Sequence, residues 1–351
     1  MKYINQFRYI MEERRQDLAE IAQKPKHLFR DSILILILGI LLFTIGTYHQ
    51  EFINFESRFA LFAQNMMQTG PTFFPTIFGV PYPDYPATST FLIYLCSLPF
   101  GQVIKLSAVL PSAIAAALSM MFVYLTMAPH SRKWGFCSVL FMVFTVAFFT
   151  HARSISLDMY TTAVASFCFY AVYARDSYQT KQLTYWIPLA LTIGFLCRGP
   201  IGLVIPSGVV FGYFLISARW KRLVIFCISA AVLLCLLAWL LLGLAHHIGG
   251  LSFMRHVILM QVTGRMNPGD SEPFFFYWSR SLGNYALSFP FAVIVTLSLL
   301  PQLFKRQPNR HIKLLQYCII ATLIIIIGMS IPGGKKTRYI MAITPFCSII
   351  A

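Results

Sequence analysis

The stretch SILILILGILLFTIGTY, residues 32–48, contains no charged residue and approaches the length needed to cross a bilayer. A membrane-spanning helix needs roughly 20 mainly apolar residues. With this stretch, the chain has about ten hydrophobic segments. The others are 103–127, 134–151, 156–174, 183–197, 200–217, 222–245, 285–304, 312–330 and 339–351. Lipid offers bare backbone groups no partner, and these runs do not alternate as barrel strands do, so they predict an all-α, polytopic transmembrane helical bundle.

Composition and charge agree with a membrane protein. Hydrophobic residues make up 57% of the chain and charged residues only 11%, whereas a soluble domain carries about a quarter charged residues. The net charge of +16 is unevenly distributed. If the N-terminus is cytoplasmic and the spans alternate, more than half of the 28 lysines and arginines fall on the cytoplasmic side. This pattern favours contact with membrane lipids and argues against a nucleic-acid partner.

The runs divide the chain into two parts. Residues 1–31 are polar and partly amphipathic, and we expect a cytoplasmic surface segment there. Residues 32–351 form the expected transmembrane domain, with long outer loops at about 49–102 and 246–284. The last run, 339–351, is short for a span, so we expect that it belongs to a longer protein.

Asp158, in HARSISLDMYTTA (151–163), is the strongest candidate for chemistry. It lies near the outer boundary of two apolar runs, where a carboxylate is costly and usually has a partner or a function. One interpretation is a structural ion pair with the nearby Arg153. The favoured interpretation is a catalytic or substrate-contacting role.

Glu56, in FESRFALFAQNMMQTG (55–70), is the second carboxylate of interest. Phe55, Phe59, Phe62 and Met66 recur at helical spacing, which predicts an interfacial helix in the first outer loop. Such a helix would hold Glu56 at the outer mouth of the bundle. The alternative is an ordinary solvated charge.

Several outer turns carry residues suited to an anionic ligand. The proline-rich GVPYPDYPATS (79–89) predicts a stiff turn that presents polar tips, or else a rigid loop with interfacial tyrosines. Basic residues in CRGPIGLVIP, VTGRMNPGDSEPFFFYWSR and IPGGKKTRYIM oppose the positive-inside rule. They are natural phosphate ligands, although snorkelling to headgroups is the alternative. The polar and basic candidates are Tyr82, Asp84, Tyr85, Arg198, Arg265, Lys335, Lys336 and Arg338.

Nothing in the sequence indicates a cofactor. His246 and His247 are adjacent and do not share a helix face, which argues against a metal pair. The eight cysteines lie in or beside apolar runs and are expected to be packing residues. No phosphate-binding glycine loop is present. The sequence predicts no metal site, but it leaves open whether a divalent metal is needed.

Five segments in order resemble the polytopic GT-C glycosyltransferases. They are FESRFALFAQNMM, GVPYPDYP, ARSISLDM, CRGPIGLVIP and GGKKTRYIM, and the resemblance covers about residues 32–351. The closest likeness is to the bacterial aminoarabinose transferases of lipid A and the protein O-mannosyltransferases.

The resemblance implies an enzyme of the bacterial inner membrane with its active site on the periplasmic side. It would transfer a sugar from a polyprenyl-phosphate donor to a lipid A, glycan or protein acceptor. Asp158 and Glu56 would be the catalytic carboxylates. The implied substrate contacts are Arg58, Tyr82, Asp84, Tyr85, Arg153, Arg198, Arg265, Lys336, Arg338 and Tyr339.

This sequence departs from the family pattern at three positions. Phe55 stands where the first-loop motif normally has an aspartate, Tyr85 where a lysine is usual, and Arg198 where a lysine is common. Two other functions therefore remain open. One is a transporter or flippase of a lipid-linked or anionic substrate, and the other is a catalytically inactive homologue. The sequence does not identify the sugar, the acceptor or the oligomeric state.

Overall fold

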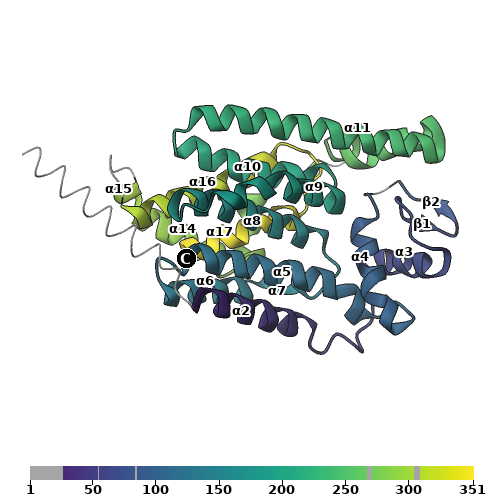
Figure 1. The fold of residues 1–351 in the computed structure, drawn as a ribbon, viewed down its shortest axis with the longest axis horizontal. Helices are drawn as coiled ribbons and strands as arrows, with labels where there is room; N and C mark the ends of the chain where they lie inside the picture. Colours follow the sequence, from purple (N-terminus) through teal and green to yellow (C-terminus); the bar gives the residue numbers. More distant parts are fainter. Residues whose placement is uncertain (1–26, 54, 84, 267–270, 304–308) are drawn as a thin grey trace, which may run out of the picture.

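The computed structural model describes residues 27–53, 55–83, 85–266, 271–303 and 309–351. The predicted all-α class is confirmed, because helices dominate these residues and the only strands among them form one small hairpin. Figure 1 shows an elongated bundle in which the long helix α11 (Trp220–Ile258) lies along one side and α2 (His27–Thr44) along the other. The expected cytoplasmic segment 1–31 lies mostly outside the described residues and remains a prediction.

Each predicted apolar run contains helix. The other helices of the bundle are α5 (Lys105–Met127), α6 (Arg132–Phe144), α7 (Val146–Ala152), α8 (Leu157–Ser177), α9 (Ile187–Arg198), α10 (Pro200–Ile216), α14 (Ser288–Ser298), α15 (Leu300–Leu303), α16 (Arg310–Ser330) and α17 (Thr344–Ile350). Within the described part, four helices are long and apolar enough to cross a membrane, or up to six if each bent pair counts as one span. The number of ten spans therefore stays a prediction.

The centre of the bundle is α8, which packs against both α5 and α10. Small residues allow close approach, as where Gly39 of α2 meets Ala117 of α5. The last helix, α17, lies in the middle of the bundle (Figure 1), and all its residues are buried. The core is therefore continuous from the first span to the last.

Two of the helices change direction within an apolar run. The expected run 134–151 is split at Thr145 into α6 and α7, which meet at 75°. In α11 the backbone departs from helical geometry at Gly249 and Gly250, where Gly250 has φ of 68°. The helix nevertheless continues beyond residue 245, where the sequence predicted a loop. It ends in a π-helical turn, Leu259–Thr263, and the short α12 (Gly264–Met266).

The segment between α2 and α5 contains two further helices, α3 (Glu56–Thr69) and α4 (Thr88–Ser97), and helices were predicted for this region. Between them, β1 (Thr76–Ile77) pairs antiparallel with β2 (Val80–Pro81). The intervening Phe78 and Gly79 both have positive φ, the geometry of a tight type I′ hairpin turn. A 3₁₀ turn, Leu98–Phe100, then leads into α5.

At the end of the bundle away from α3 and α4, two acidic residues are each paired with an arginine. Asp31 accepts hydrogen bonds from Arg132 and Tyr124, and Asp176 accepts them from Arg219 and Tyr213. In the α5–α6 connection, burial is the main cause that lowers the pKa of His130 to about 3, so this imidazole is neutral at physiological pH. This end therefore carries fixed structural ion pairs.

Substituting Gly194 by Ala is expected to destabilise the fold by about 1–3 kcal/mol, because α9 and α10 cross there with their backbones in contact. An added methyl group at Gly194 would overlap the carbonyl oxygen of Gly202. An added methyl group at Gly202 would likewise overlap the carbonyl oxygen of Gly194. Thermal unfolding in detergent measures the effect. Gly243→Ala is the matched control, because nothing lies near that position, and an equal loss in both variants would contradict the explanation.

Candidate functional site

Asp158 is the centre of a charged cluster at the end of the bundle that bears α3 and α4. It lies in the first turn of α8 and is 4% exposed. Nε and Nη2 of Arg198 lie 3.0 and 2.9 Å from its Oδ1, while Nε of Arg338 lies 3.6 Å from its Oδ2. The N-terminus of α8 adds a favourable dipole for the carboxylate. The structural alternative, a pair with Arg153, is wrong, because two other arginines take that place.

Arg198 is the last residue of α9, and its side chain is only 2% exposed. The turn into α10 is made by Gly199, which has φ of 69°. A Cβ on Gly199 would lie 2.7 Å from Oε1 of Gln261 and 3.2 Å from the Tyr85 ring, so only glycine fits. The CRGP segment therefore directs a buried guanidinium at Asp158 while allowing two other side chains to approach the turn.

Tyr85 lies between two arginines. Its hydroxyl accepts hydrogen bonds from Arg198 and Arg265, and both guanidinium groups lie about 5 Å from the centre of its ring (5.1 and 5.0 Å). Both contacts are in the range of cation–π attraction. The neutral side chain of Tyr85 thus separates two positive charges, at the position where the family that the sequence resembles usually has a lysine.

Arg338 and Tyr339 complete the cluster from the turn that precedes α17. The guanidinium of Arg338 lies 4.5 Å from the centre of the Phe55 ring. The ring of Tyr339 lies 5.2 Å from the guanidinium of Arg198. Phe55 therefore faces the cluster and supplies an aromatic surface there in place of a carboxylate.

Gln261 belongs to the same site, although the sequence analysis missed it. It lies in the π-helical turn after α11 and is 6% exposed, yet neither its Oε1 nor its Nε2 has a hydrogen-bond partner. Nη1 of Arg265 is also buried without a partner. Such π-turns are frequent at functional sites, and buried polar atoms are normally satisfied. The side-chain amide of Gln261 and Nη1 of Arg265 are therefore available to form hydrogen bonds with a polar ligand.

The other carboxylate, Glu56, has a different environment. It is 4% exposed, forms an ion pair with Lys105, and accepts hydrogen bonds from the backbone N–H groups of Ile53 (3.0 Å) and Ile155 (3.1 Å). The alternative interpretation of Glu56 as an ordinary solvated charge is therefore wrong. Both of its carboxylate oxygens are engaged by protein groups.

The segment 153–156, which we call the anchor loop, leads directly into α8. Arg153 donates to the carbonyls of Leu42 and Ile45 at the end of α2, at 2.8 and 2.7 Å. Ile155 binds Glu56, and the N–H of Ser156 donates to Oγ of Ser112 at 2.9 Å. The loop that positions Asp158 is thus tied to α2, α3 and α5.

The remaining predicted site residues are not brought into the cluster. Arg58 donates to the Tyr82 hydroxyl at 3.4 Å within the first loop. Lys336 is exposed. Nζ of Lys335 donates to the Glu272 carbonyl at 2.8 Å. Asp84 lies outside the described residues. The cluster that does form is Tyr85, Asp158, Arg198, Arg265, Arg338 and Tyr339, with Phe55 and Gln261 beside it.

Charge indicates what this cluster can bind. Arg198 and Arg338 contact Asp158, and Arg265 reaches the cluster through the Tyr85 hydroxyl, which leaves a formal excess of two positive charges among the described side chains. Asp158 and Arg198 are buried and the other two arginines are partly buried, so an unneutralised excess is costly and an anion relieves it. Guanidinium groups match phosphate oxygens especially well. The described residues contain no group of three potential metal-ligating side chains, and His246 and His247 are exposed on α11.

The fold resembles that of one class of membrane protein, the GT-C glycosyltransferases, as the five motifs predicted. A family model described as dolichyl-phosphate-mannose-protein mannosyltransferase matches residues 84–242. The helical fold is shared with ArnT from Cupriavidus metallidurans bound to undecaprenyl phosphate, with a TM-score of 0.71 at 16% identity over 91% of this chain and 58% of that one. The archaeal oligosaccharyltransferase AglB from Archaeoglobus fulgidus gives 0.53 at 13% identity, over 91% and 50%.

Curated proteins with similar sequences include one named as a glycosyltransferase of this kind. An undecaprenyl phosphate-alpha-4-amino-4-deoxy-L-arabinose arabinosyl transferase of Pseudomonas paraeruginosa is 26% identical over 88% of this chain and 56% of its own length. An uncharacterised protein of Aquifex aeolicus is 24% identical, over 91% and 62%. The chain thus spans less than two thirds of the length of these curated relatives.

Proposed function

We propose that this chain is a membrane glycosyltransferase that takes a sugar from a polyprenyl-phosphate donor. The observation that carries the proposal is the cluster in which Arg198 and Arg338 contact Asp158, and Arg265 and Arg198 share the Tyr85 hydroxyl, with an excess of positive charge. It occurs in a fold shared with a protein solved with undecaprenyl phosphate. A phosphate monoester or diester would supply the charge that the cluster lacks.

In the proposed reaction, an oxygen of the acceptor attacks the anomeric carbon of the sugar. The bond between that carbon and the lipid phosphate oxygen breaks, and the polyprenyl phosphate leaves with the bonding electrons. Asp158 orients the acceptor and takes its proton. Arg198, Arg265 and Arg338 stabilise the charge that develops on the departing phosphate.

Tyr85 has a supporting part in this proposal. In the structure its hydroxyl accepts from both Arg198 and Arg265. A phosphate oxygen is a stronger acceptor for guanidinium than a neutral hydroxyl. Both arginines can therefore transfer their hydrogen bonds from Tyr85 to the ligand with little movement. We assign Glu56 a positioning role, through the anchor loop that precedes Asp158.

We place the reaction on the periplasmic face of a bacterial inner membrane, with the N-terminus in the cytoplasm. The uneven distribution of basic residues supports this orientation. The proposed acceptors are lipid A, another surface glycan or a protein hydroxyl. The first donor to test is undecaprenyl phosphate-aminoarabinose, the donor in the name of the Pseudomonas relative.

One observation favours a second candidate function, binding of the lipid carrier without sugar transfer. Phe55 takes the usual aspartate position and packs against Arg338, while Glu56 is neutralised by Lys105. The two candidates differ in turnover. Sugar transfer in proteoliposomes supports the enzyme, whereas tight carrier binding with no product supports the second function.

Replacing Arg265 by Gln is expected to weaken binding of undecaprenyl phosphate by about 10- to 100-fold, since a charge-assisted hydrogen bond contributes about 1.5–3 kcal/mol. Calorimetric titration in detergent measures the affinity. Arg255→Gln is the matched control, because Arg255 is exposed on α11 outside the cluster. Equal affinities for wild type and R265Q would overturn the phosphate-binding role.

Replacing Gln261 by Leu is expected to have opposite effects on stability and binding. The free energy of unfolding should stay level or rise by about 1 kcal/mol, because the amide has no protein partner to lose. Affinity for the lipid-linked donor should fall about tenfold. Gln316→Leu is the control, because Gln316 donates to the Leu303 carbonyl at 2.6 Å and its loss should only destabilise. Unchanged donor affinity in Q261L would remove Gln261 from the site.

A further inference from the structure

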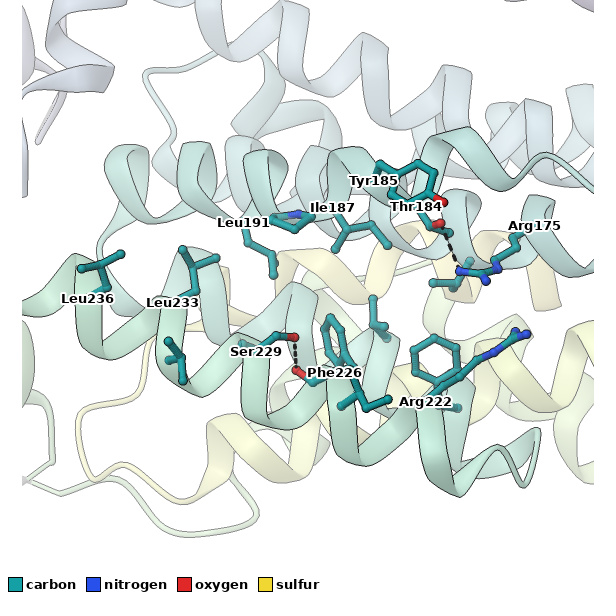
Figure 2. Close-up of a pocket in the computed structure, with 17 residues that line it drawn as sticks. Arg175, Thr184, Tyr185, Ile187, Leu191, Arg222, Phe226, Ser229, Leu233 and Leu236 are labelled. Carbon is teal, nitrogen blue, oxygen red and sulfur yellow. Dashed lines mark hydrogen bonds between the residues drawn. The ribbon is translucent and has the colours of Figure 1, made fainter.

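A long apolar groove lies between α11 and the neighbouring helices α8, α9 and α10. Its volume is about 540 Å³. Figure 2 shows Phe226, Ser229, Leu233 and Leu236 along the α11 wall, with Ile187 and Leu191 of α9 opposite them. The hydroxyl of Ser229 already donates to the Phe226 carbonyl at 2.9 Å. The middle of the groove therefore presents a hydrocarbon surface.

One end of the groove is basic. Arg175 of α8 and Arg222 of α11 come together at the same end in Figure 2, beside Thr184 and Tyr185. Nη1 of Arg175 donates to Oγ1 of Thr184 at 3.3 Å, and Nη1 of Arg222 lies 3.5 Å from Oδ1 of Asp176. Asp176 is already bound by Arg219 and Tyr213, so it only partly offsets these charges. Both guanidinium groups retain donors for an anion.

The groove is long enough to hold a lipid chain. Leu236 follows Arg222 by fourteen residues, which is about 21 Å along a helix. The hydrocarbon layer of one leaflet is about 15 Å thick, half of a roughly 30 Å core. An acyl chain that starts at the two arginines therefore fits within the groove.

The groove is separate from the Asp158 cluster. Asp158 and Arg175 lie near opposite ends of α8, seventeen residues apart, which is about 25 Å. None of the cluster residues lines the groove. A second ligand can thus bind there while the donor occupies the cluster.

We propose that this groove is a binding site for an anionic phospholipid, with the phosphate at Arg175 and Arg222 and one acyl chain against α9 and α11. Charge and hydrophobicity together select this ligand. A peptide would leave its backbone groups without partners along the apolar walls. A zwitterionic lipid would gain less from the two arginines, because its own cation opposes them.

The test measures binding of phosphatidylglycerol and phosphatidylcholine with identical acyl chains to the purified chain in detergent, by native mass spectrometry. Wild type is expected to bind phosphatidylglycerol at least tenfold more tightly. The double variant Arg175→Gln/Arg222→Gln should lose this preference. Lys221→Gln is the matched control, because Lys221 adjoins Arg222 but does not line the groove.

The part of the groove that would bind the acyl chain is tested with a separate variant. Leu233→Trp should fill the groove and lower the affinity for both lipids at least tenfold, whereas Ile228→Trp, on the exposed face of α11, should not. Equal binding of the two lipids by wild type overturns the proposal. So does displacement of phosphatidylglycerol by undecaprenyl phosphate that depends on Arg175 and Arg222, since the groove would then serve the carrier. Sugar transfer at Asp158 is measured separately in proteoliposomes, so failure of the lipid-site proposal is distinguishable from failure of the proposed function.

Discussion

Asp158→Asn is expected to lower the turnover number for sugar transfer by about 10²–10⁴-fold, the usual contribution of a positioned acid or base. The substitution keeps the shape of the side chain but removes its charge and its capacity to take a proton. It also leaves Arg198 buried without a counter-ion, which is expected to cost about 3–5 kcal/mol of stability. Turnover must therefore be measured per folded molecule, in proteoliposomes with saturating donor, beside a thermal unfolding curve.

Asp176→Asn is the matched control for that experiment. Asp176 also pairs with an arginine, Arg219, but lies at the opposite end of α8 from Asp158. This variant should lose some stability and keep its turnover. Wild-type turnover in folded D158N would exclude Asp158 from the reaction.

Glu56→Gln is expected to produce the largest loss of stability among single substitutions in the first loop, about 3–5 kcal/mol. The ion pair with Lys105 is buried on both sides, with side-chain exposures of 5% each. The glutamine leaves the Lys105 ammonium buried without a counter-ion. Sugar transfer should fall as well, because the unpaired Lys105 ammonium is expected to displace the side chain at position 56, which holds the anchor loop through the Ile155 N–H. Chemical denaturation gives the free energy of unfolding, and the transfer assay gives the activity.

The double variant Glu56→Gln/Lys105→Met separates positioning from catalysis. Removing both partners of a buried ion pair is often nearly neutral, so stability should recover. If Glu56 only positions the anchor loop, turnover recovers with stability, because the glutamine can still accept from the Ile155 N–H. A stable double variant with no turnover would instead identify Glu56 as a reacting group.

The helices were predictable because apolar composition is a local property of the sequence. The run 103–127, for example, contains α5, and the run 32–48 overlaps most of α2. The end of α11 was not predictable in this way. His246, His247 and the Gly249–Gly250 pair reduce the apolar signal, yet the chain remains helical on both sides of the break.

Several members of the cluster could be predicted, but their pairings could not. A predicted position at the outer boundary and unusual charge pointed to Asp158, Arg198, Arg265 and Arg338. The partner of Asp158 depended on how α8 and α9 pack, since Arg198 is forty residues away in sequence and Arg153 only five. Gln261 was missed because a glutamine near an apolar run carries little signal by itself. Its π-helical turn and unpartnered amide become visible only in three dimensions.

The anchor loop has a consequence for substitutions near Asp158. Arg153, Glu56 and Ser112 hold the loop, and none of them belongs to the arginine cluster itself. The groups that position Asp158 are thus distinct from the arginines that would meet a ligand. We therefore expect that a substitution in the cluster can change the ligand preference without moving the loop that precedes Asp158.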